Sequence, residues 1–561
     1  MRRALARGYG AAELRADVLA GAVVGVVALP LSMALAIAVG APPQHGLYTA
    51  IFAGAVTALL GGCKFQITGP TAAFVVILAP IVSQHGLAGL LTAGFMAGLM
   101  LVIMGLAGLG NLIKFVPYPV TTGFTTGIAT VIATLQIKDV LGLKVGPMPE
   151  HYHEKVEALW AARATADGRE LAVAALTLVL LLLIPRVVKR IPAPLLAITA
   201  AASVAALAHA VDPSFSVATI GSRFHTVVNG VEVAGIPPVL PHPSLPWSDL
   251  HMDFQQLRTL LPAAFAIALL GAIESLLSAV IADGMTGTRH DPNAELVGQG
   301  LGNMVAPIFG GIAATGALAR TATAIRAGAR SPLTAVTHAL VVLAAMLFLA
   351  PLVAYVPMAS LAALLLLVAW NMSEIKHFLE VLRIGPKSDV SVLLTCFLLT
   401  VIFDMVWAVS VGFVLAAVLF MRRMAEITES RFAVEGDLVE RDLPALPPGV
   451  TVYEVNGPLF FGAAQQAMES LHAAHGDAFR LLILNLGRVP VIDTTGLVAL
   501  ESTLHSLRRR GKVVLLAGPL PRPDRIWERA RAEGKLDGVE VCEDLEAAAE
   551  RARELCAAAA A

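Results

Sequence analysis

The chain has 561 residues, of which 57% are hydrophobic and only 14% are charged. Soluble domains carry about 25% charged residues, so this composition excludes a protein that is soluble throughout. The formal net charge of −1 gives no reason to expect a nucleic-acid partner. Charged residues are sparse from residue 16 to 420 and dense thereafter. We therefore expect a transmembrane domain at 1–425, a linker at 426–447 and a soluble domain at 448–556.

The apolar part contains a series of segments that suit membrane helices, each of which needs about 20 mostly apolar residues. The first segment follows an arginine-rich N-terminus, but it is too long for a signal peptide and many similar segments follow it. We therefore expect about fourteen spans. They lie near 17–39, 46–62, 69–83, 87–108, 117–136, 170–188, 193–211, 259–281, 295–309, 313–327, 332–352, 358–371, 389–405 and 407–424.

The distribution of basic residues predicts the orientation of the spans. Cytoplasmic loops of membrane proteins are enriched in Lys and Arg. With a cytoplasmic N-terminus, the loops at 326–330 and 376–387 fall inside and are basic. The short loops at 40–45 and 84–86 fall outside and contain neither Lys nor Arg. Both termini are therefore expected in the cytoplasm.

Two short segments rich in Gly and Pro interrupt this pattern, at 67–74 and 310–321. They are the third and tenth of the fourteen segments, and a shift of seven relates two repeats of inverted topology. Interrupted spans at matching places in two halves point to the binding site of a transporter. The N–H groups at the start of such half-helices can bind an anion. The alternative is that Gly and Pro are simply common in membrane helices.

Glu274 lies within the apolar run 260–282. An ionised carboxylate inside a membrane is costly, by roughly 2.5–3.5 kcal/mol on insertion scales, and is a functional candidate by default. Because burial favours the neutral form, such a carboxyl can load and release a proton. We therefore expect Glu274 to be the proton-coupling group. The alternative is a structural carboxyl bonded to a neighbouring amide or hydroxyl.

Several motifs together resemble one known family over essentially the whole chain. They are Ala28-Leu29-Pro30-Leu31-Ser32-Met33-Ala34, Gly46-Leu47-Tyr48, Thr68-Gly69-Pro70, Gly271-Ala272-Ile273-Glu274-Ser275-Leu276-Leu277, the stretch 293–303 and Asp493-Thr494-Thr495-Gly496. On these residues the chain resembles the SulP (solute carrier 26) anion transporters, which carry a C-terminal STAS domain. Further segments, such as Asp283-Gly284-Met285-Thr286-Gly287-Thr288, are similar to the bacterial C4-dicarboxylate branch of that family.

The resemblance implies an α-helical polytopic membrane protein of two inverted seven-span repeats. Spans 1–4 and 8–11 would form a core domain, and spans 5–7 and 12–14 a gate domain. Substrate would bind between half-helices 3 and 10, and the core would slide against the gate as an elevator. A homodimer in the bacterial inner (plasma) membrane is also implied.

The resemblance places Arg320 near the anion, where a guanidinium can hold carboxylate or sulfate oxygens with two donors. The alternative is an Arg that merely follows the positive-inside rule, as we expect of Arg326 and Arg330. The other lining side chains are small or aliphatic, which favours a ligand with a carbon skeleton over sulfate or chloride. The expected substrate-binding residues are Leu31, Leu35, Gly69, Pro70, Thr71, Ala72, Thr315, Gly316, Ala317, Leu318 and Arg320.

No metal ion or cofactor is expected. Sodium-coupled relatives place a hydroxyl where this chain has Leu318, although Ser278 is kept, so the resemblance favours protons over sodium. None of the four cysteines forms a CxxC pair that would suggest a zinc site. Asp283, Arg289, His290 and Asp291 follow span 8, and we interpret them as surface charge.

The C-terminal part alternates short strands with helices, which predicts a small α/β layer domain. The expected strands are 450–454, 459–460, 480–486 and 512–516, and the expected helices include 462–474 and 496–509. In related regulators a hydroxyl in the Asp493–Gly496 turn is phosphorylated, so Thr494 and Thr495 are the candidates here. The alternative is that Asp or Thr merely caps the helix.

The sequence thus predicts a secondary active transporter and not an enzyme. The leading hypothesis is proton-coupled uptake of C4-dicarboxylates such as succinate, fumarate, malate or aspartate. A sulfate or bicarbonate carrier and an uncoupled anion conductor are the alternatives. Beside the anion and protons, the expected partners are the lipid bilayer, a second copy of the chain and cytoplasmic proteins that bind the STAS domain.

Overall fold

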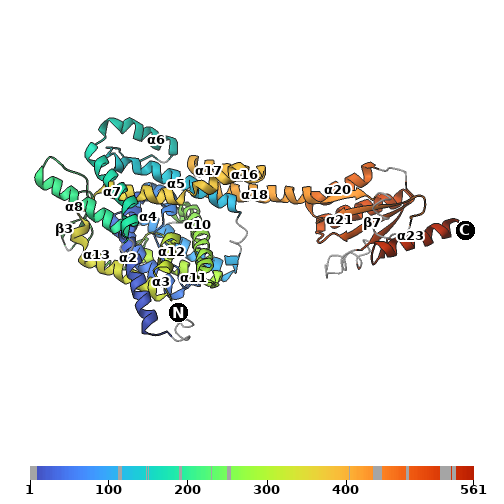
Figure 1. The fold of residues 1–561 in the computed structure, drawn as a ribbon, viewed down its shortest axis with the longest axis horizontal. Coiled ribbons are helices and arrows are strands. Elements are labelled where there is room, and N and C mark those ends of the chain that lie inside the picture. The colour runs from blue at the N-terminus through green and yellow to red at the C-terminus, as the bar shows by residue number, and fades with distance from the viewer. Residues whose placement is uncertain are drawn as a thin grey trace. The chain divides into compact units, whose positions relative to one another are not determined.

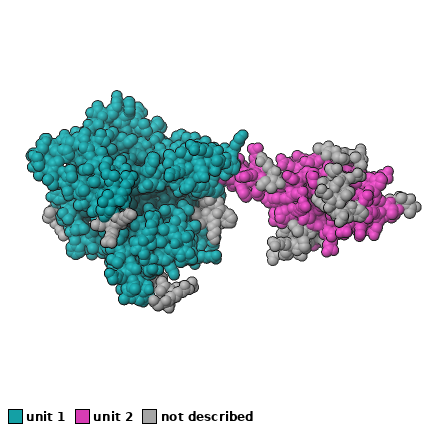
Figure 2. All heavy atoms as spheres, in the orientation of Figure 1, with its two compact units in different colours: residues 1–413 teal, residues 414–561 magenta. Residues whose placement is uncertain are grey.

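A computed structural model describes residues 9–111, 117–146, 148–149, 151–188, 192–228, 230–248, 254–403, 405–433, 445–474, 479–518, 532 and 539–560. The chain forms two compact units, Met1–Phe413 and Val414–Ala561 (Figure 2). The boundary falls within helix α18 (Met405–Ile427). Of the expected linker 426–447, residues 434–444 lie outside the described residues.

Unit 1 is almost entirely helical (Figure 1). One set of helices packs around α4, α10 and α11 and carries the two interrupted segments. This set consists of α2 (Ala11–Val39), α3 (Pro43–Leu60), α4 (Ala72–Leu106), α10 (Phe254–Thr286), α11 (Pro292–Ile308), α12 (Leu318–Arg326) and α13 (Leu333–Phe348).

A second set of helices packs around α5 and α15. It consists of α5 (Tyr118–Val140), α7 (Gly168–Val187), α8 (Ala193–Val211), α15 (Met358–Met372), α16 (Ile375–Ile384) and α17 (Lys387–Ile402). Shorter elements lie in the connections: α6 (Tyr152–Ala161), η2 (Ala162–Thr165), α9 (Ile220–Arg223), α14 (Ala350–Val353) and the hairpin of β2 (His225–Val228) with β3 (Val231–Ala234).

Each of the fourteen predicted segments falls on a helix. The third and fourth share α4, which is interrupted at Gly86, where φ is +67°. Only Gly adopts this conformation at little cost, so the chain turns there between two helices. Among the described residues, seven helices are long and apolar enough to cross a membrane. The count of fourteen spans therefore stays a prediction.

Small residues let the helices of the first set approach closely. Gly98 of α4 and Gly300 of α11 face each other, and a Cβ on either would lie within 2.7 Å of the other's carbonyl oxygen. Gly298 of α11 packs in the same way against the backbone of Gly61. Close backbone approach through small residues is typical of helix packing in membranes, where dispersion contacts replace the hydrophobic effect.

Unit 2 is a five-stranded sheet in the order β5-β6-β7-β8-β9, antiparallel between β5 and β6 and otherwise parallel. Leu482 and Leu484 of β7 pack with α20 and α21, whereas Leu481 and Ile483 pack with α23. Because alternate side chains of a strand point to opposite faces, α20 and α21 cover one face of the sheet and α23 covers the other. Figure 1 shows these helices beside the sheet. The elements are β5 (Glu429–Phe432), β6 (Val450–Asn456), α20 (Phe461–Ala474), β7 (Leu481–Arg488), α21 (Thr494–Arg509), β8 (Val513–Ala517), β9 (Glu540–Cys542) and α23 (Leu545–Ala560).

The structure corrects the prediction for unit 2 in two places. The expected strand at 459–460 is a single bridge from Leu459 to Ile492. Residues 429–432, which were expected to be linker, form strand β5. They form a strand because they pair with β6, and the charged local sequence gives no sign of this pairing.

A buried carboxylate joins the start of α2 to the start of α13. Asp17 is fully buried, and its oxygens accept bonds from the backbone N–H of Arg330 at 2.6 Å and of Ser331 at 3.0 Å. The hydroxyls of Thr334 at 2.6 Å and Tyr9 at 2.6 Å also donate to it. A buried charge is tolerated where donors surround it in this way.

Replacing Asp17 with Ala is expected to cost about 2 kcal/mol or more, because several buried donors lose their acceptor. The apparent melting temperature in detergent, followed by intrinsic fluorescence, should fall by several degrees. Arg15→Ala, on the exposed side of the same helix, should leave it unchanged. Equal melting temperatures for the two variants would contradict this role of Asp17.

Candidate anion-binding site

Two short strands bring the interrupted segments together. β1 (Thr68–Gly69) pairs antiparallel with β4 (Thr315–Gly316), with Thr68 opposite Gly316 and Gly69 opposite Thr315. The backbone N–H of Ala317 extends the pairing by donating to the carbonyl of Ile67 at 2.8 Å. The expected juxtaposition of the third and tenth segments is thus present in the structure.

A helix begins directly after each strand. Thr71 is the N-cap of α4 and Ala317 the N-cap of α12, and neither side chain caps its helix. The first N–H groups of a helix have no partner within it and carry partial positive charge. Ala72, the first residue of α4, is buried, whereas Leu318, the first residue of α12, is 42% exposed. Two helix N-termini suited to an anion therefore start from one paired strand.

Arg320 lies in the first turn of α12 and is only 2% exposed. Its Nη2 donates to the carbonyl of Pro70, while Nε and Nη1 bond no described residue. Gly69 packs against the guanidinium and leaves no room there for a Cβ. Arg326, by contrast, is exposed. Burial favours the anion-binding interpretation of Arg320 over the positive-inside alternative, because a buried cation requires a compensating partner.

Glu274 reaches the same place from α10. It is half-buried, and its Oε2 accepts a hydrogen bond from Thr71 Oγ1 at 2.9 Å. A purely structural role for Glu274 would require a bond to a neighbouring amide or hydroxyl, and Thr71 supplies such a hydroxyl. The bond also links the carboxyl to the N-cap of α4, so the expected proton-coupling and anion-binding residues are in direct contact.

α10 also fixes the position of β4. Ser275 Oγ lies 2.8 Å from Thr315 Oγ1 and accepts the N–H of Gly316 at 3.0 Å. Thr315 Oγ1 also lies 3.3 Å from the carbonyl of Gly271, to which it can donate. The backbone N–H of Gly316 is therefore bonded to Ser275 and is not free to bind an anion. Ser278, one turn further along, donates to Thr321 at 3.4 Å.

A polar row on α11 holds both strands, and the sequence did not reveal this role. Glu295 accepts from the N–H of Cys63 and from Gln66 Nε2, each at 2.8 Å. Gln299 donates to Thr68 Oγ1 at 2.8 Å. Asn303 accepts from the N–H of Ala314 and donates to its carbonyl, each at 2.8 Å. The spacing i, i+4, i+8 within an apolar segment was the available signal.

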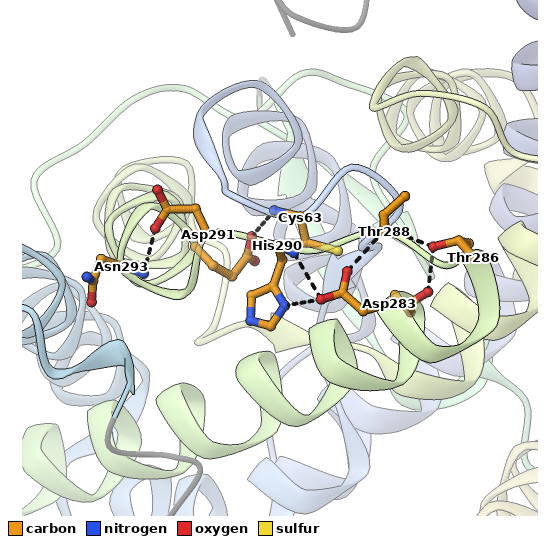
Figure 3. A network of polar contacts seen from close by, with 9 residues as sticks. Cys63, Asp283, Thr286, Thr288, His290, Asp291 and Asn293 are labelled. Carbon is orange, nitrogen blue, oxygen red and sulfur yellow. Dashed lines mark hydrogen bonds and ion pairs between the residues drawn. The ribbon is translucent and has the colours of Figure 1, made fainter.

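The turn between α10 and α11 is a bonded network, not free surface charge (Figure 3). Asp283 accepts from the backbone N–H of His290 at 2.9 Å and contacts its Nδ1 at 2.7 Å. Thr288 also donates to Asp283, at 3.1 Å. The side chains of His290 and Asp283 are only 8% and 19% exposed. The surface interpretation of these two residues was wrong, because the turn folds back on its own carboxylate.

Leu31 and Leu35 lie one turn apart on α2, the first half-buried and the second buried. α2 packs against both α4 and α12, which places this aliphatic face beside the two half-helices. Because both residues are Leu, neither side chain can donate a hydrogen bond to an anion.

The expected regulatory turn lies in unit 2. Asp493 caps α21 by accepting the N–H of Gly496 at 2.7 Å. Thr494 and Thr495 begin the helix and are both exposed. Asp493 therefore performs the capping, and the two hydroxyls remain candidates for modification.

Comparisons with known proteins identify the family. The sulfate permease family model matches residues 14–396, and the STAS domain model matches residues 445–548. The chain therefore belongs to the sulfate permease (SulP) family of anion transporters and carries a C-terminal STAS domain. Family membership confirms a multi-pass membrane transporter rather than an enzyme.

Relatives that match nearly the whole chain include two bacterial transporters. A Bacillus subtilis (strain 168) protein named "Putative sulfate transporter YvdB" is 42% identical, over 93% of this chain and 95% of its own length. The bicarbonate transporter BicA of Picosynechococcus (strain ATCC 27264 / PCC 7002 / PR-6) is 30% identical, over 92% of this chain and 91% of its own. These names concern sulfate and bicarbonate, so the dicarboxylate branch stays a prediction.

Solved structures agree on the fold. Murine Slc26a9 in the inward-facing state matches with a TM-score of 0.84 at 18% identity, over 98% of this chain and 93% of its own. The transmembrane domain of a cyanobacterial BicA matches with a TM-score of 0.61 at 28% identity, over 73% of this chain and 98% of its own.

Gly69→Ala is expected to reduce anion uptake about tenfold or more, because a Cβ would displace the Arg320 guanidinium and small misplacements are costly. Gly284→Ala is the matched control, since a Cβ at Gly284 meets nothing within 4 Å. Uptake of sulfate, bicarbonate and succinate into proteoliposomes measures both. Wild-type uptake by Gly69→Ala would contradict the proposed placement of Arg320.

Asp493→Ala should lower the stability of unit 2 by about 1 kcal/mol through loss of the N-cap. Thr494→Ala and Thr495→Ala should each change it by less than about 0.5 kcal/mol, because both side chains are exposed. Urea unfolding of the full chain, followed by a probe in unit 2, distinguishes these effects. A large loss for either threonine would show that the structure needs that hydroxyl.

Proposed function

We propose that this chain is a proton-coupled importer of small organic anions, with C4-dicarboxylates as the leading substrates. The observation that carries the proposal is the hydrogen bond between Glu274 and Thr71, the N-cap of α4. This bond connects the proposed proton carrier to the half-helix that would bind the anion.

Electrostatics supplies the coupling. Ionised Glu274 and a bound anion would place two negative charges beside the same helix N-terminus, and they repel strongly in a medium of low dielectric constant. Protonation of Glu274 removes that repulsion, so that Arg320 and the two helix N-termini can bind the anion. The anion and the proton therefore bind together, which is the requirement for symport.

The lining of the site supports an organic anion. Leu31, Leu35, Ala317 and Leu318 provide aliphatic or small side chains beside the donors. One carboxylate would lie between the helix N-termini and Arg320, with the carbon chain along the aliphatic face. Sulfate or bicarbonate is the second candidate, because the relatives YvdB and BicA carry those names.

The two helix sets of unit 1 suit the expected elevator mechanism. The set around α4, α10 and α11 would be the moving core, and the set around α5 and α15 the gate. We place the protein as a homodimer in the bacterial inner membrane with both termini cytoplasmic. The STAS domain would serve regulation or docking of cytoplasmic proteins through the turn at Thr494 and Thr495.

The test is uptake of labelled succinate and fumarate into proteoliposomes, with and without an inward proton gradient, beside sulfate and bicarbonate. The wild type should show saturable dicarboxylate uptake that the gradient accelerates. Glu274→Gln should lose the acceleration by the gradient while it keeps exchange of labelled for unlabelled substrate, because a permanently neutral side chain still permits anion binding.

Ser278→Ala, on the same helix, is the matched control and should keep the response to protons. Gradient-driven uptake by Glu274→Gln would exclude Glu274 as the proton carrier. Transport of sulfate or bicarbonate, but not of succinate or fumarate, would show that the proposed substrate is wrong. The effect of Glu274→Gln on that transport would then test the proton coupling. Large unsaturable currents would instead indicate an anion conductor.

A further inference from the structure

The connection from α8 to α10, residues 212–253, joins the two helix sets of unit 1. α8 belongs to the set around α5 and α15, the gate set, and α10 belongs to the set around α4 and α11, the core set. If this connection were flexible, it could follow any relative movement of the two sets, because long loops cost little to rearrange. The contacts of its described residues, 212–228 and 230–248, show that it is attached to both sets.

The first part of the connection is attached to the gate set. The backbone N–H of Ala218 donates to Glu170 Oε1 of α7 at 2.6 Å, and its carbonyl accepts from the N–H of Met358, the first residue of α15, at 2.8 Å. The hairpin of β2 and β3 follows, and Gly235 at its end packs so closely against Ala354 that a Cβ would lie 3.1 Å from the alanine methyl group. Residues 218–235 are therefore held beside the start of α15.

The last part of the connection is attached to the core set. The backbone N–H of Ser244 donates to the carbonyl of Ile308, at the end of α11, at 2.8 Å. The indole of Trp247 packs edge-on against Phe95 of α4, with ring centres 5.1 Å apart. This end is therefore fixed to two helices of the core set before α10 begins.

The stretch between these attachments is rich in proline. Proline fixes its own φ and restricts the residue before it, so such segments act as semi-rigid spacers. Pro238 and Pro243 are exposed, so burial does not account for them. A further bond from the hairpin to the core set, between Gln44 Nε2 and Thr226 Oγ1, is long at 3.4 Å. The stretch reads Ile236-Pro237-Pro238-Val239-Leu240-Pro241-His242-Pro243.

We propose that residues 236–243 form a strut that holds the core set at a defined separation from the gate set and limits how far the core set can travel. The strut lies on the side that the distribution of basic residues predicts to be outside. Movement of the core set then takes place by rotation of the strut about its two attachments, and not by extension of the connection. The proposal rests on the proposed elevator movement, but on neither Glu274 nor the preferred substrate.

The test measures the distance between the two helix sets by pulsed electron paramagnetic resonance. Spin labels are attached to Ser83→Cys on α4 and Ala210→Cys on α8, two exposed positions, in the full-length protein in lipid nanodiscs. Cys542 and Cys556 are replaced with Ser to prevent labelling, whereas the other two cysteines are buried.

Two changes in the strut should broaden the measured distance distribution by about half or more, because flexible residues sample many separations. The first inserts four glycines after His242, which lengthens the strut. The second replaces Pro238, Pro241 and Pro243 with Gly, which softens it at constant length. As a matched control, four glycines inserted after Gly230, in the hairpin turn, lengthen the same connection on the gate side of the strut and should leave the distribution unchanged.

The attachment to the core set has its own variant. Trp247→Ala removes the contact with Phe95 and should also broaden the distribution, whereas Trp160→Ala, at a 69% exposed position of α6, should not. A distribution that stays as narrow as in the wild type in both strut variants, or that the control insertion broadens equally, would overturn the strut. An unchanged distribution in Trp247→Ala would overturn the attachment to α4. Because distances and not transport are measured, failure here is distinct from failure of proton coupling or of the proposed substrate.

Discussion

The pairing of β1 with β4 is the constraint on which the candidate site depends. Two strands of two residues each supply very few hydrogen bonds, so the pairing cannot hold itself. Ser275 of α10 supports it from one side, and Gln299 and Asn303 of α11 support it from the other. Because α4 and α12 begin directly after the strands, these supports also determine where both helix N-termini point.

The same supports also supply partners for two ionisable side chains. Arg320 is buried in α12 and Glu274 is half-buried in the apolar helix α10, where an isolated charge would be neutralised or excluded. The strands place the carbonyl of Pro70 against the guanidinium and the hydroxyl of Thr71 against the carboxyl. Each charge thus has one partner from the protein and retains capacity for another. A site that satisfied both groups completely would have little affinity left for an anion.

The apolar periodicity and the glycine-rich segments predicted much of this arrangement. They located the helices and the pairing of 67–74 with 310–321, because membrane burial makes charge and helix breaks conspicuous. They also singled out Glu274, whose role as proton carrier stays a prediction. They did not predict the roles of Glu295 and Gln299, since their partners Gln66 and Thr68 are more than two hundred residues away. Strand β5 was missed for a similar reason, as only its partner makes it a strand.

The composition of the site has a consequence for selectivity. Backbone N–H groups and one Arg recognise negative charge and small size, but they distinguish poorly between oxyanions of similar charge. In the proposed site, the aliphatic side chains of Leu31 and Leu35 would add tolerance for a carbon skeleton without adding a donor. Under the proposed coupling, discrimination would come from a step that accompanies binding, namely the requirement for a proton on Glu274.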